Sequence, residues 1–440
     1  MLAQAEDGGK GLKRTLGAGN LVALGVGAII GAGLFVRTAA AAGQAAGPAV
    51  TLSFIIAAIG CAFAGLCYAE FAAMIPISGS AYAYSYVTMG ETVAWIIGWA
   101  LIMEYALGAA TVSIAWSEYL NKLLGGSIPY EWSHSPFESV TDTAGVIHHG
   151  IMNAPSLVIL LLLTLLLIKG TQESAIVNAI IVFVKVAIVI IFIVLGWQFI
   201  KPENHTPYFI PADQPPLLDA SGKIVADYSG VFKHGWGGVL GGAAIVFFAF
   251  IGFDAVSTQA GEAKNPKKDV PFAIVMSLVI CTVLYIIVSL VLTGMVKYNA
   301  LDLKAPVASA FEGVGMPWAT ILITVAAVAG LTSVMLVMML GQTRIFLGMA
   351  KDGLLPRNLF GSVHPKFKTP FKSTLLVGAI VSVIAAFTPI DKVSEMCSMG
   401  TLLAFSMVCL AVWILRFRDP NRDRPFKVSG LNIVAPLPIH

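Results

Sequence analysis

Long apolar stretches separated by short polar ones run from about residue 20 to about residue 415. A helix of about 20 apolar residues crosses the roughly 30 Å hydrocarbon core of a bilayer. The pattern therefore predicts an all-α, polytopic membrane protein. Ten stretches have the length and character of membrane-spanning helices: 20–44, 50–74, 92–122, 154–169, 175–199, 237–261, 272–296, 317–350, 373–388 and 393–415.

Composition excludes most soluble classes of protein. Of the 440 residues, 57% are hydrophobic and only 12% are charged, whereas a soluble domain has about 25% charged residues. So few charges could not cover a water-facing surface of this size, which excludes a soluble enzyme, a nucleic-acid binder and a disordered scaffold. The net charge of +3 is too small to indicate a polyanionic partner.

Cysteine and histidine give no sign of catalysis or metal binding. The five cysteines lie in apolar runs without a CxxC pair, which favours free thiols packed as small hydrophobic groups. The seven histidines lie in polar stretches or at the end of the chain, without the spacing of zinc ligands. We therefore expect no metal, no cofactor and no enzymatic activity.

Basic residues predict the orientation. With the N-terminus inside, 18 of the 27 lysines and arginines fall on one face of the membrane and eight on the other, while Lys185 lies within a span. The positive-inside rule then places both termini in the cytoplasm. The predicted organisation is a cytoplasmic segment 1–19, spans one to five in 20–199, an extracellular loop 200–236, spans six to ten in 237–415 and a cytoplasmic segment 416–440.

Four glycines, Gly25, Gly27, Gly31 and Gly33, lie in the middle of the first predicted span. Close helix packing through small residues is one interpretation. We favour a broken helix, because glycine costs about 1 kcal/mol relative to alanine in a helix interior. Unwound backbone at this depth must lie beside a cavity or protein. Its free N–H and C=O groups suit a carboxylate and an ammonium group, respectively.

The sixth predicted span has a matching irregularity. Aromatic residues surround Gly252 in the middle of the span, and Asp254 follows. With five spans in each half of the chain, this span corresponds to the first. Interruptions at corresponding positions of two halves indicate the binding site of a transporter.

Two ionisable residues lie deep in predicted spans. Lys185 is about ten residues into span five, and a charge at that depth costs at least about 2.5–3.5 kcal/mol. Because burial disfavours a charged amine, Lys185 is a candidate proton carrier; the alternative is a fixed structural cation. Glu104 lies mid-way along span three, where it either lines a cavity or bonds to a neighbouring helix. Glu70, Glu118 and Asp254 lie nearer span ends, where we expect solvated or capping roles.

Three segments, 27–35, 247–257 and 262–271, together resemble the amino acid–polyamine–organocation (APC) superfamily. Segments 341–344 and 352–356 are similar to its cationic amino acid transporter branch, and the likeness to a bacterial-type amino acid permease covers about residues 12–427. The resemblance implies a LeuT-type fold with a 5+5 inverted repeat, in which helices 1 and 6 are broken. Family members usually have twelve or fourteen spans. This sequence stops where an eleventh would begin, so it is either a fragment or lacks the later spans.

The resemblance also implies roles for particular residues. The substrate carboxylate would bind backbone N–H groups of the first break, and its ammonium group would bind carbonyls of the second. Span three of this branch carries a matching acid. The implied substrate-binding residues are Ile29, Gly31, Ala32, Gly33, Phe248, Ala249, Ile251, Glu104 and Met338. The implied proton-coupling residues are Lys185, Gly27, Ile30, Thr332 and Ser333, where sodium-coupled relatives hold Na⁺.

The expected function is secondary active transport of an amino acid by alternating access, with proton symport, in the inner or plasma membrane. A proton-independent exchanger or facilitator remains the alternative. The expected partners are an L-amino acid, protons and membrane lipids, with no nucleic acid. Bulky Met338 and the phenylalanines of span six favour a small neutral substrate. A cationic substrate remains open.

Overall fold

The computed structural model describes residues 16–75, 80–141, 146–169, 175–218, 224–260, 263–364, 367 and 369–428, and these are mostly helical. Six helical stretches among them are long and apolar enough to cross a membrane: Gly33–Met74, Glu91–Leu123, Gly235–Thr258, Pro266–Met295, Pro317–Lys351 and Ile390–Arg418. Shorter apolar helices occupy Ala18–Ile29, Ala154–Lys169, Ile181–Trp197 and Phe371–Phe387. Each of the ten predicted stretches coincides with helical structure, so the chain is an integral membrane protein.

The first half of the chain contains helices of very different length. The elements are α2 (Ala18–Ile29), η1 (Gly33–Arg37), α3 (Thr38–Ala41), η2 (Ala42–Ala46), η3 (Gly47–Ala49), α4 (Val50–Met74), α5 (Ser80–Met89), α6 (Glu91–Leu123), α7 (Tyr130–Ser133), β1 (Ser139–Thr141), β2 (Ile147–His149), α8 (Ala154–Lys169) and α9 (Ala175–Trp197). Strands β1 and β2 form an antiparallel pair between α7 and α8.

The second half repeats the alternation of short and long helices. Its elements are η4 (Pro202–His205), β3 (Leu217–Leu218), β4 (Ile224–Ala226), α10 (Gly235–Val246), η5 (Phe247–Phe250), α11 (Ala255–Thr258), α12 (Pro266–Met295), η7 (Tyr298–Ala300), α13 (Pro306–Gly313), α14 (Pro317–Lys351), α15 (Arg357–Phe360), α16 (Phe371–Phe387) and α17 (Ile390–Arg418). Proline stands at the start of α12, α13 and α14, where its missing N–H has no helical partner to lose.

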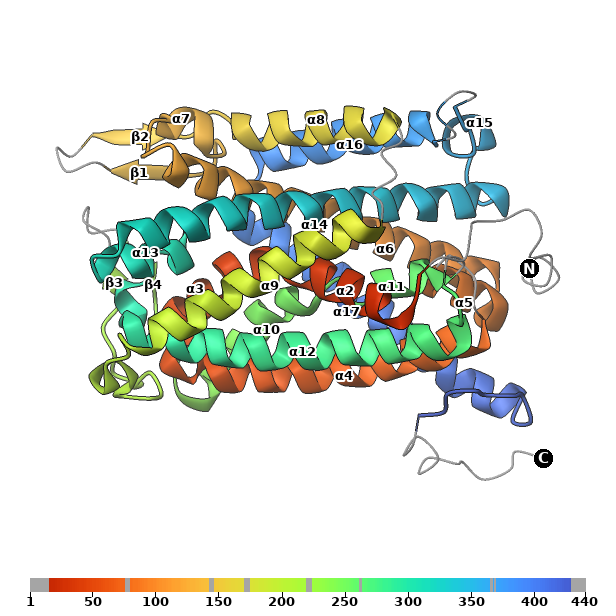
Figure 1. The fold of residues 1–440 in the computed structure, drawn as a ribbon, viewed down its shortest axis with the longest axis horizontal. Helices are drawn as coiled ribbons and strands as arrows, with labels where there is room; N and C mark the ends of the chain where they lie inside the picture. Colours follow the sequence, from red (N-terminus) through yellow and green to blue (C-terminus); the bar gives the residue numbers. More distant parts are fainter. Residues whose placement is uncertain are drawn as a thin grey trace.

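The long helices run across the molecule side by side, with α8 and α16 along one edge and α4 and α12 along the other (Figure 1). Both strand pairs and α13 lie at one end, and α5 and α11 lie toward the other (Figure 1). Helices are the expected solution in lipid, because each backbone polar group then finds its partner within its own segment.

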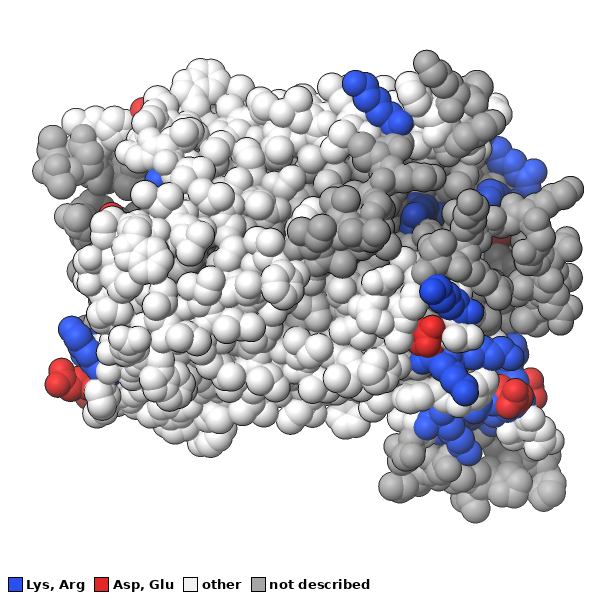
Figure 2. All heavy atoms as spheres, in the orientation of Figure 1, with Lys and Arg blue, Asp and Glu red and all other residues white. Residues whose placement is uncertain are grey.

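Surface charge on one face of the molecule gathers at its two ends. On the face drawn in Figure 2, the wide middle region shows neither basic nor acidic side chains. Lysines and arginines gather at the right-hand end of this face, where α5 and α15 lie in Figure 1. This distribution fits a bilayer around the middle region, and it is the asymmetry on which the predicted orientation rests.

Candidate functional site

The first apolar stretch is interrupted in its middle. Helix α2 ends at Ile29, and Ile30 is extended, with φ −72° and ψ 101°. Helical structure resumes at Gly33 as η1. The Gly31 carbonyl accepts from the N–H groups of Leu34 and Phe35, at 3.1 and 3.2 Å. The break therefore leaves the last carbonyls of α2 without helical partners, whereas the N–H groups of Leu34 and Phe35 already bond to Gly31.

The sixth stretch is interrupted as well. Helix α10 passes into η5, Ile251 is extended, and α11 begins only at Ala255. Gly252 has φ +114°, a conformation that L side chains rarely adopt, and a Cβ here would lie 2.9 Å from the Ala28 carbonyl oxygen. Glycine is therefore required at this position both by its backbone conformation and by the close approach of α2.

The two interruptions lie against each other. A Cβ added to Gly33 would lie 2.2 Å from the Cα atom of Ala249, so the backbones meet without a side chain between them. Tyr285 of α12 reaches both breaks, because its hydroxyl lies 2.8 Å from the Ile29 carbonyl oxygen and 2.9 Å from that of Ala249. Tyr285 is not among the site residues predicted from the sequence. Its signal was that it is the one tyrosine in the apolar stretch 272–296, where a buried hydroxyl needs a partner.

Lys185 lies beside the first break and is only 2% exposed. Its Nζ atom donates to the carbonyl oxygens of Gly27 at 2.9 Å and Ile30 at 3.0 Å, and to Ser333 Oγ at 3.1 Å. Ser333 in turn donates to the Gly330 carbonyl at 2.8 Å. Among the described residues, Lys185 has neutral oxygens as partners and no carboxylate.

Thr332 does not join this group. Its hydroxyl donates to the Val328 carbonyl at 2.8 Å, on its own helix. Successive residues of a helix point about 100° apart, so Thr332 and Ser333 cannot both face Lys185. Of the predicted coupling residues, the structure brings Gly27, Ile30 and Ser333 to the lysine and leaves Thr332 aside.

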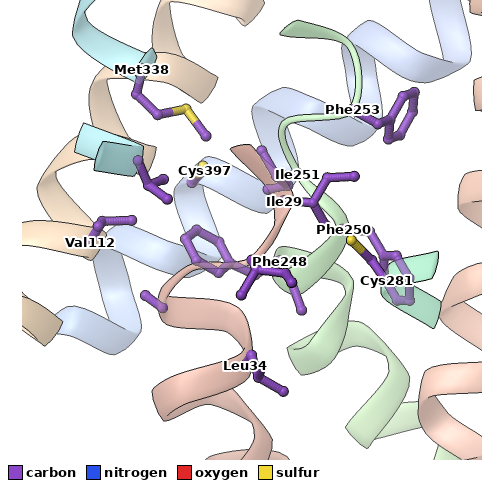
Figure 3. Packing of buried hydrophobic residues seen from close by; sticks show 14 of the residues in the cluster. Ile29, Leu34, Val112, Phe248, Phe250, Ile251, Phe253, Cys281, Met338 and Cys397 are labelled. Carbon is purple, nitrogen blue, oxygen red and sulfur yellow. The ribbon is translucent and has the colours of Figure 1, made fainter. Parts of the chain in front are cut away.

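Apolar side chains pack around the two breaks. Figure 3 shows Met338, Cys397 and Val112 on one side of the two breaks, and Phe250 and Cys281 on the other. Every residue predicted to bind substrate is buried or is a glycine of the break; these are Ile29, Gly31, Ala32, Gly33, Phe248, Ala249, Ile251, Glu104 and Met338. The breaks are therefore buried inside the molecule.

Two sulfur atoms, one of Met338 and one of Cys397, lie close to Gly108. A Cβ on Gly108 would lie 3.4 Å from Met338 Sδ and 3.7 Å from Cys397 Sγ. Cys397 was expected only to pack as a small hydrophobic residue. It is fully buried, and its thiol donates to the backbone carbonyl of Glu104 at 3.2 Å. The position of Cys397 beside Met338 depends on how α17 packs on α6, which no local sequence pattern reveals.

Two of the acids predicted to be solvated or capping, Asp254 and Glu70, are both 0% exposed, so the solvated role is wrong for them. Asp254 does stand at the N-cap position of α11, although its side chain makes no capping hydrogen bond. Asp254 directly follows the second break and accepts from the Tyr105 hydroxyl at 2.7 Å. Glu70 lies under the segment that follows α17. Its Oε2 accepts from Arg416 Nη2 at 2.5 Å and from the Val428 N–H at 2.9 Å. Tertiary contacts, and not distance from a span end, decide the exposure of both carboxyl groups.

Glu104 is 1% exposed. Neither of its carboxyl oxygens has a hydrogen-bond partner of ordinary geometry among the described residues. The polar groups that interact with it are Asp254 and the Thr401 hydroxyl. Its carboxyl group thus faces the acid that follows the second break.

Two facing helix breaks and a buried lysine inside a bundle of apolar helices are typical of a membrane transport protein. The chain belongs to the amino acid permease family, whose model matches residues 16–438. The resemblance to the APC superfamily is thereby confirmed.

Relatives with curated names agree with this class. The chain is 42% identical over 430 residues to the methylthioribose transporter of Bacillus subtilis (strain 168), covering 98% of this chain and 87% of the relative. It is 41% identical over 441 residues to the branched-chain amino acid permease BcaP of the same strain, covering 100% and 88%. It is 37% identical over 418 residues to the vacuolar cationic amino acid transporter 4 of Arabidopsis thaliana, covering 94% and 65%.

Proposed function

We propose that this chain is a secondary active transporter of the inner or plasma membrane that carries a small neutral L-amino acid together with a proton. The observation that carries the proposal is the position of Lys185. Its ammonium group occupies the broken end of α2 and bonds to three oxygens, Gly27 O, Ile30 O and Ser333 Oγ. A membrane-buried cation without an anionic partner is disfavoured, so its proton is available for exchange.

The substrate would bind across the two breaks. The N–H groups around Gly31, Ala32 and Gly33 suit its carboxylate, and the carbonyls of Phe248, Ala249 and Ile251 suit its ammonium group. The Ala249 carbonyl oxygen accepts from Tyr285 and can still accept a second hydrogen bond, because a carbonyl oxygen has two lone pairs.

The apolar lining favours a neutral substrate side chain. Met338, Phe248 and Cys397 are buried beside the breaks, and none of them could neutralise a cation. Two relatives are named for branched-chain amino acids and methylthioribose, whereas the plant relative is named for cationic amino acids. A cationic side chain would need an acid, and Glu104, the acid near mid-depth, faces Asp254.

The mechanism we propose is alternating access in a 5+5 inverted repeat. Spans 1, 2, 6 and 7 would move against spans 3, 4, 8 and 9. Protonated Lys185 joins α9 to α2 and α14 through its three hydrogen bonds. Loss of the proton removes a donor and the charge, so the contact weakens and α2 can separate from α9. The predicted cytoplasmic termini would place the N-terminal half of α2 on the inner side.

Uptake into proteoliposomes tests this function. We would measure radiolabelled alanine, free of sodium throughout, with and without an inside-alkaline pH gradient, and with excess unlabelled arginine in a parallel sample. We expect accumulation only with the gradient, with little competition by arginine. Lys185→Ala should reduce gradient-driven accumulation at least about tenfold, the equivalent of about 1.4 kcal/mol.

The other possible outcomes of this experiment each contradict one part of the proposed function. Uptake that only equilibrates, whatever the gradient, indicates an exchanger or facilitator in which Lys185 is a fixed cation. Proton-coupled uptake that persists in Lys185→Ala contradicts the role of the lysine. Strong competition by arginine contradicts the neutral substrate.

A further inference from the structure

A second buried polar cluster lies between α6 and the second break, apart from the three oxygens to which Lys185 donates. Its centre is the pair of acids Glu104 and Asp254, which are 1% and 0% exposed. Tyr105, the neighbour of Glu104 on α6, donates to Asp254 Oδ2 at 2.7 Å. Gly341 of α14 makes room for this tyrosine, because a Cβ there would lie 2.6 Å from the Tyr105 ring. Glu104 and Asp254 also interact with each other directly, so two carboxyl groups lie together inside the membrane.

No basic group neutralises this pair among the described residues, and neither acid forms an ion pair there. The titratable groups that face the two acids are contributed by α4, α5, α6 and α17. They are Tyr68, Tyr84, Tyr105 and Cys397. All four are neutral when protonated, so the pair carries any charge alone. Two adjacent carboxylates at low dielectric repel each other strongly, and one of them then keeps a proton.

Hydrogen bonds distinguish the two acids. Asp254 receives a donor from Tyr105, and a carboxylate that accepts hydrogen bonds is stabilised as the anion. Both oxygens of Glu104 lack a donor of ordinary geometry, and the nearby Thr401 hydroxyl donates to the Cys397 carbonyl at 3.0 Å. An ionised carboxylate in that position would be an unpaired buried charge. Protonated, Glu104 gains an O–H that can donate, and the unpartnered Oδ1 of Asp254 is a free acceptor.

We propose that Glu104 and Asp254 form a second proton-binding site, in which Glu104 holds the proton and donates it in a hydrogen bond to the Asp254 carboxylate. The site joins α6 to the segment after the second break, whereas Lys185 joins α9 to the first. Transfer of the proton out of this site would leave two facing anions and drive the segment away from α6. The proposal goes beyond coupling through Lys185 and does not depend on it.

Infrared spectroscopy of the purified full chain in lipid nanodiscs tests the site without any transport assay. At neutral pH the wild-type protein should show the carbonyl stretch of a protonated carboxylic acid, shifted to lower frequency in D₂O. Glu104→Gln should remove this band. Asp254→Asn should keep it at a changed frequency, because the hydrogen-bond acceptor has changed. Glu118→Gln is the matched control on the same helix, since Glu118 already lies 3.1 Å from His134 and should not contribute to the band.

Several results would overturn the proposal: no protonated carboxyl band in the wild type, a band that survives Glu104→Gln, or an unchanged frequency in Asp254→Asn. If Glu104→Gln does not elute as a folded protein, the D₂O shift and the Asp254→Asn frequency still decide. Lys185→Ala should retain the band even where it abolishes uptake, and loss of the band there would show one coupled site. A wild type that shows the band but no proton-driven uptake would contradict the proposed function and leave this site standing.

Discussion

The two helix breaks occupy corresponding positions in the two halves of the chain, but the ionisable side chains beside them differ: a lysine at the first and an aspartate at the second. The first exposes the carbonyls of Gly27 and Ile30, and a lysine donates to them. The second is followed by Asp254, an acid that accepts from Tyr105. A helix that stops in the membrane must find partners for its free groups. Here the two breaks share Tyr285 of α12 and otherwise find partners on different helices. Because a basic side chain lies at the first break and an acidic one at the second, we propose that a change of protonation releases one break without releasing the other.

The close approach of the breaks should be the most sensitive feature of this comparison. Gly33→Ala would place a Cβ 2.2 Å from the Cα atom of Ala249, a backbone atom that cannot turn away. We expect loss of uptake and a strongly reduced yield of folded protein, measured by size-exclusion chromatography and alanine uptake. Gly19→Ala in α2 is the control, since nothing lies within 4 Å of its Cβ. Normal uptake by Gly33→Ala would mean that the two breaks lie further apart than described.

Tyr285→Phe should have the next largest effect, because it removes the hydroxyl that both breaks share. The Ile29 and Ala249 carbonyls would lose this donor, and an unsatisfied buried group costs about 1–3 kcal/mol. We expect a lower Tm and about a tenfold or greater loss of uptake. Tyr86→Phe is the control, because the Tyr86 hydroxyl donates to Glu91 on the exposed surface. Equal effects of the two substitutions would show that Tyr285 has no special role at the breaks.

Ser333→Ala compared with Thr332→Val separates two adjacent hydroxyls at the first break. Ser333 Oγ accepts from Lys185 at 3.1 Å, whereas the Thr332 hydroxyl donates to Val328 on its own helix. Ser333→Ala removes one of three acceptors of the ammonium group, a loss of about 1–3 kcal/mol for a bond to a charged group. We expect the pH dependence of uptake to change in Ser333→Ala and to stay unchanged in Thr332→Val. The reverse result would place Thr332 and not Ser333 against the lysine.

The sequence reveals what depends on local pattern. Ten apolar stretches predict where the helices lie, and glycines of the first span together with Gly252 indicate both breaks. Lys185 is visible because a charge in an apolar span is rare. Which residues face it is decided by helix rotation, so Ser333 and Thr332 could not be told apart.

Contacts between distant helices left no such pattern. Tyr285 and Tyr105 look like ordinary core aromatics until the structure shows what their hydroxyls bind. Asp254 lies near the end of the predicted span 237–261. Its burial becomes visible only in the packing of α6 against the second break. The tertiary structure is therefore needed exactly where the partner of a polar group belongs to another helix.

We expect the smallest and most selective effect on uptake from a substitution at Gly108, which lies beside apolar side chains near the breaks. A Cβ on Gly108 would meet Met338 Sδ at 3.4 Å and Cys397 Sγ at 3.7 Å, which is ordinary van der Waals contact. Gly108→Ala should therefore fold normally, because neither sulfur must move. The added methyl group should leave less room for the substrate side chain beside the breaks. A change of one methylene alters discrimination between two substrates by about 1–3 kcal/mol. We expect KM to rise for leucine and to change little for alanine, measured by competition against radiolabelled alanine. A KM that rises equally for both amino acids would mean that Gly108 supports the breaks themselves, where every substrate binds, and does not line the space for the side chain.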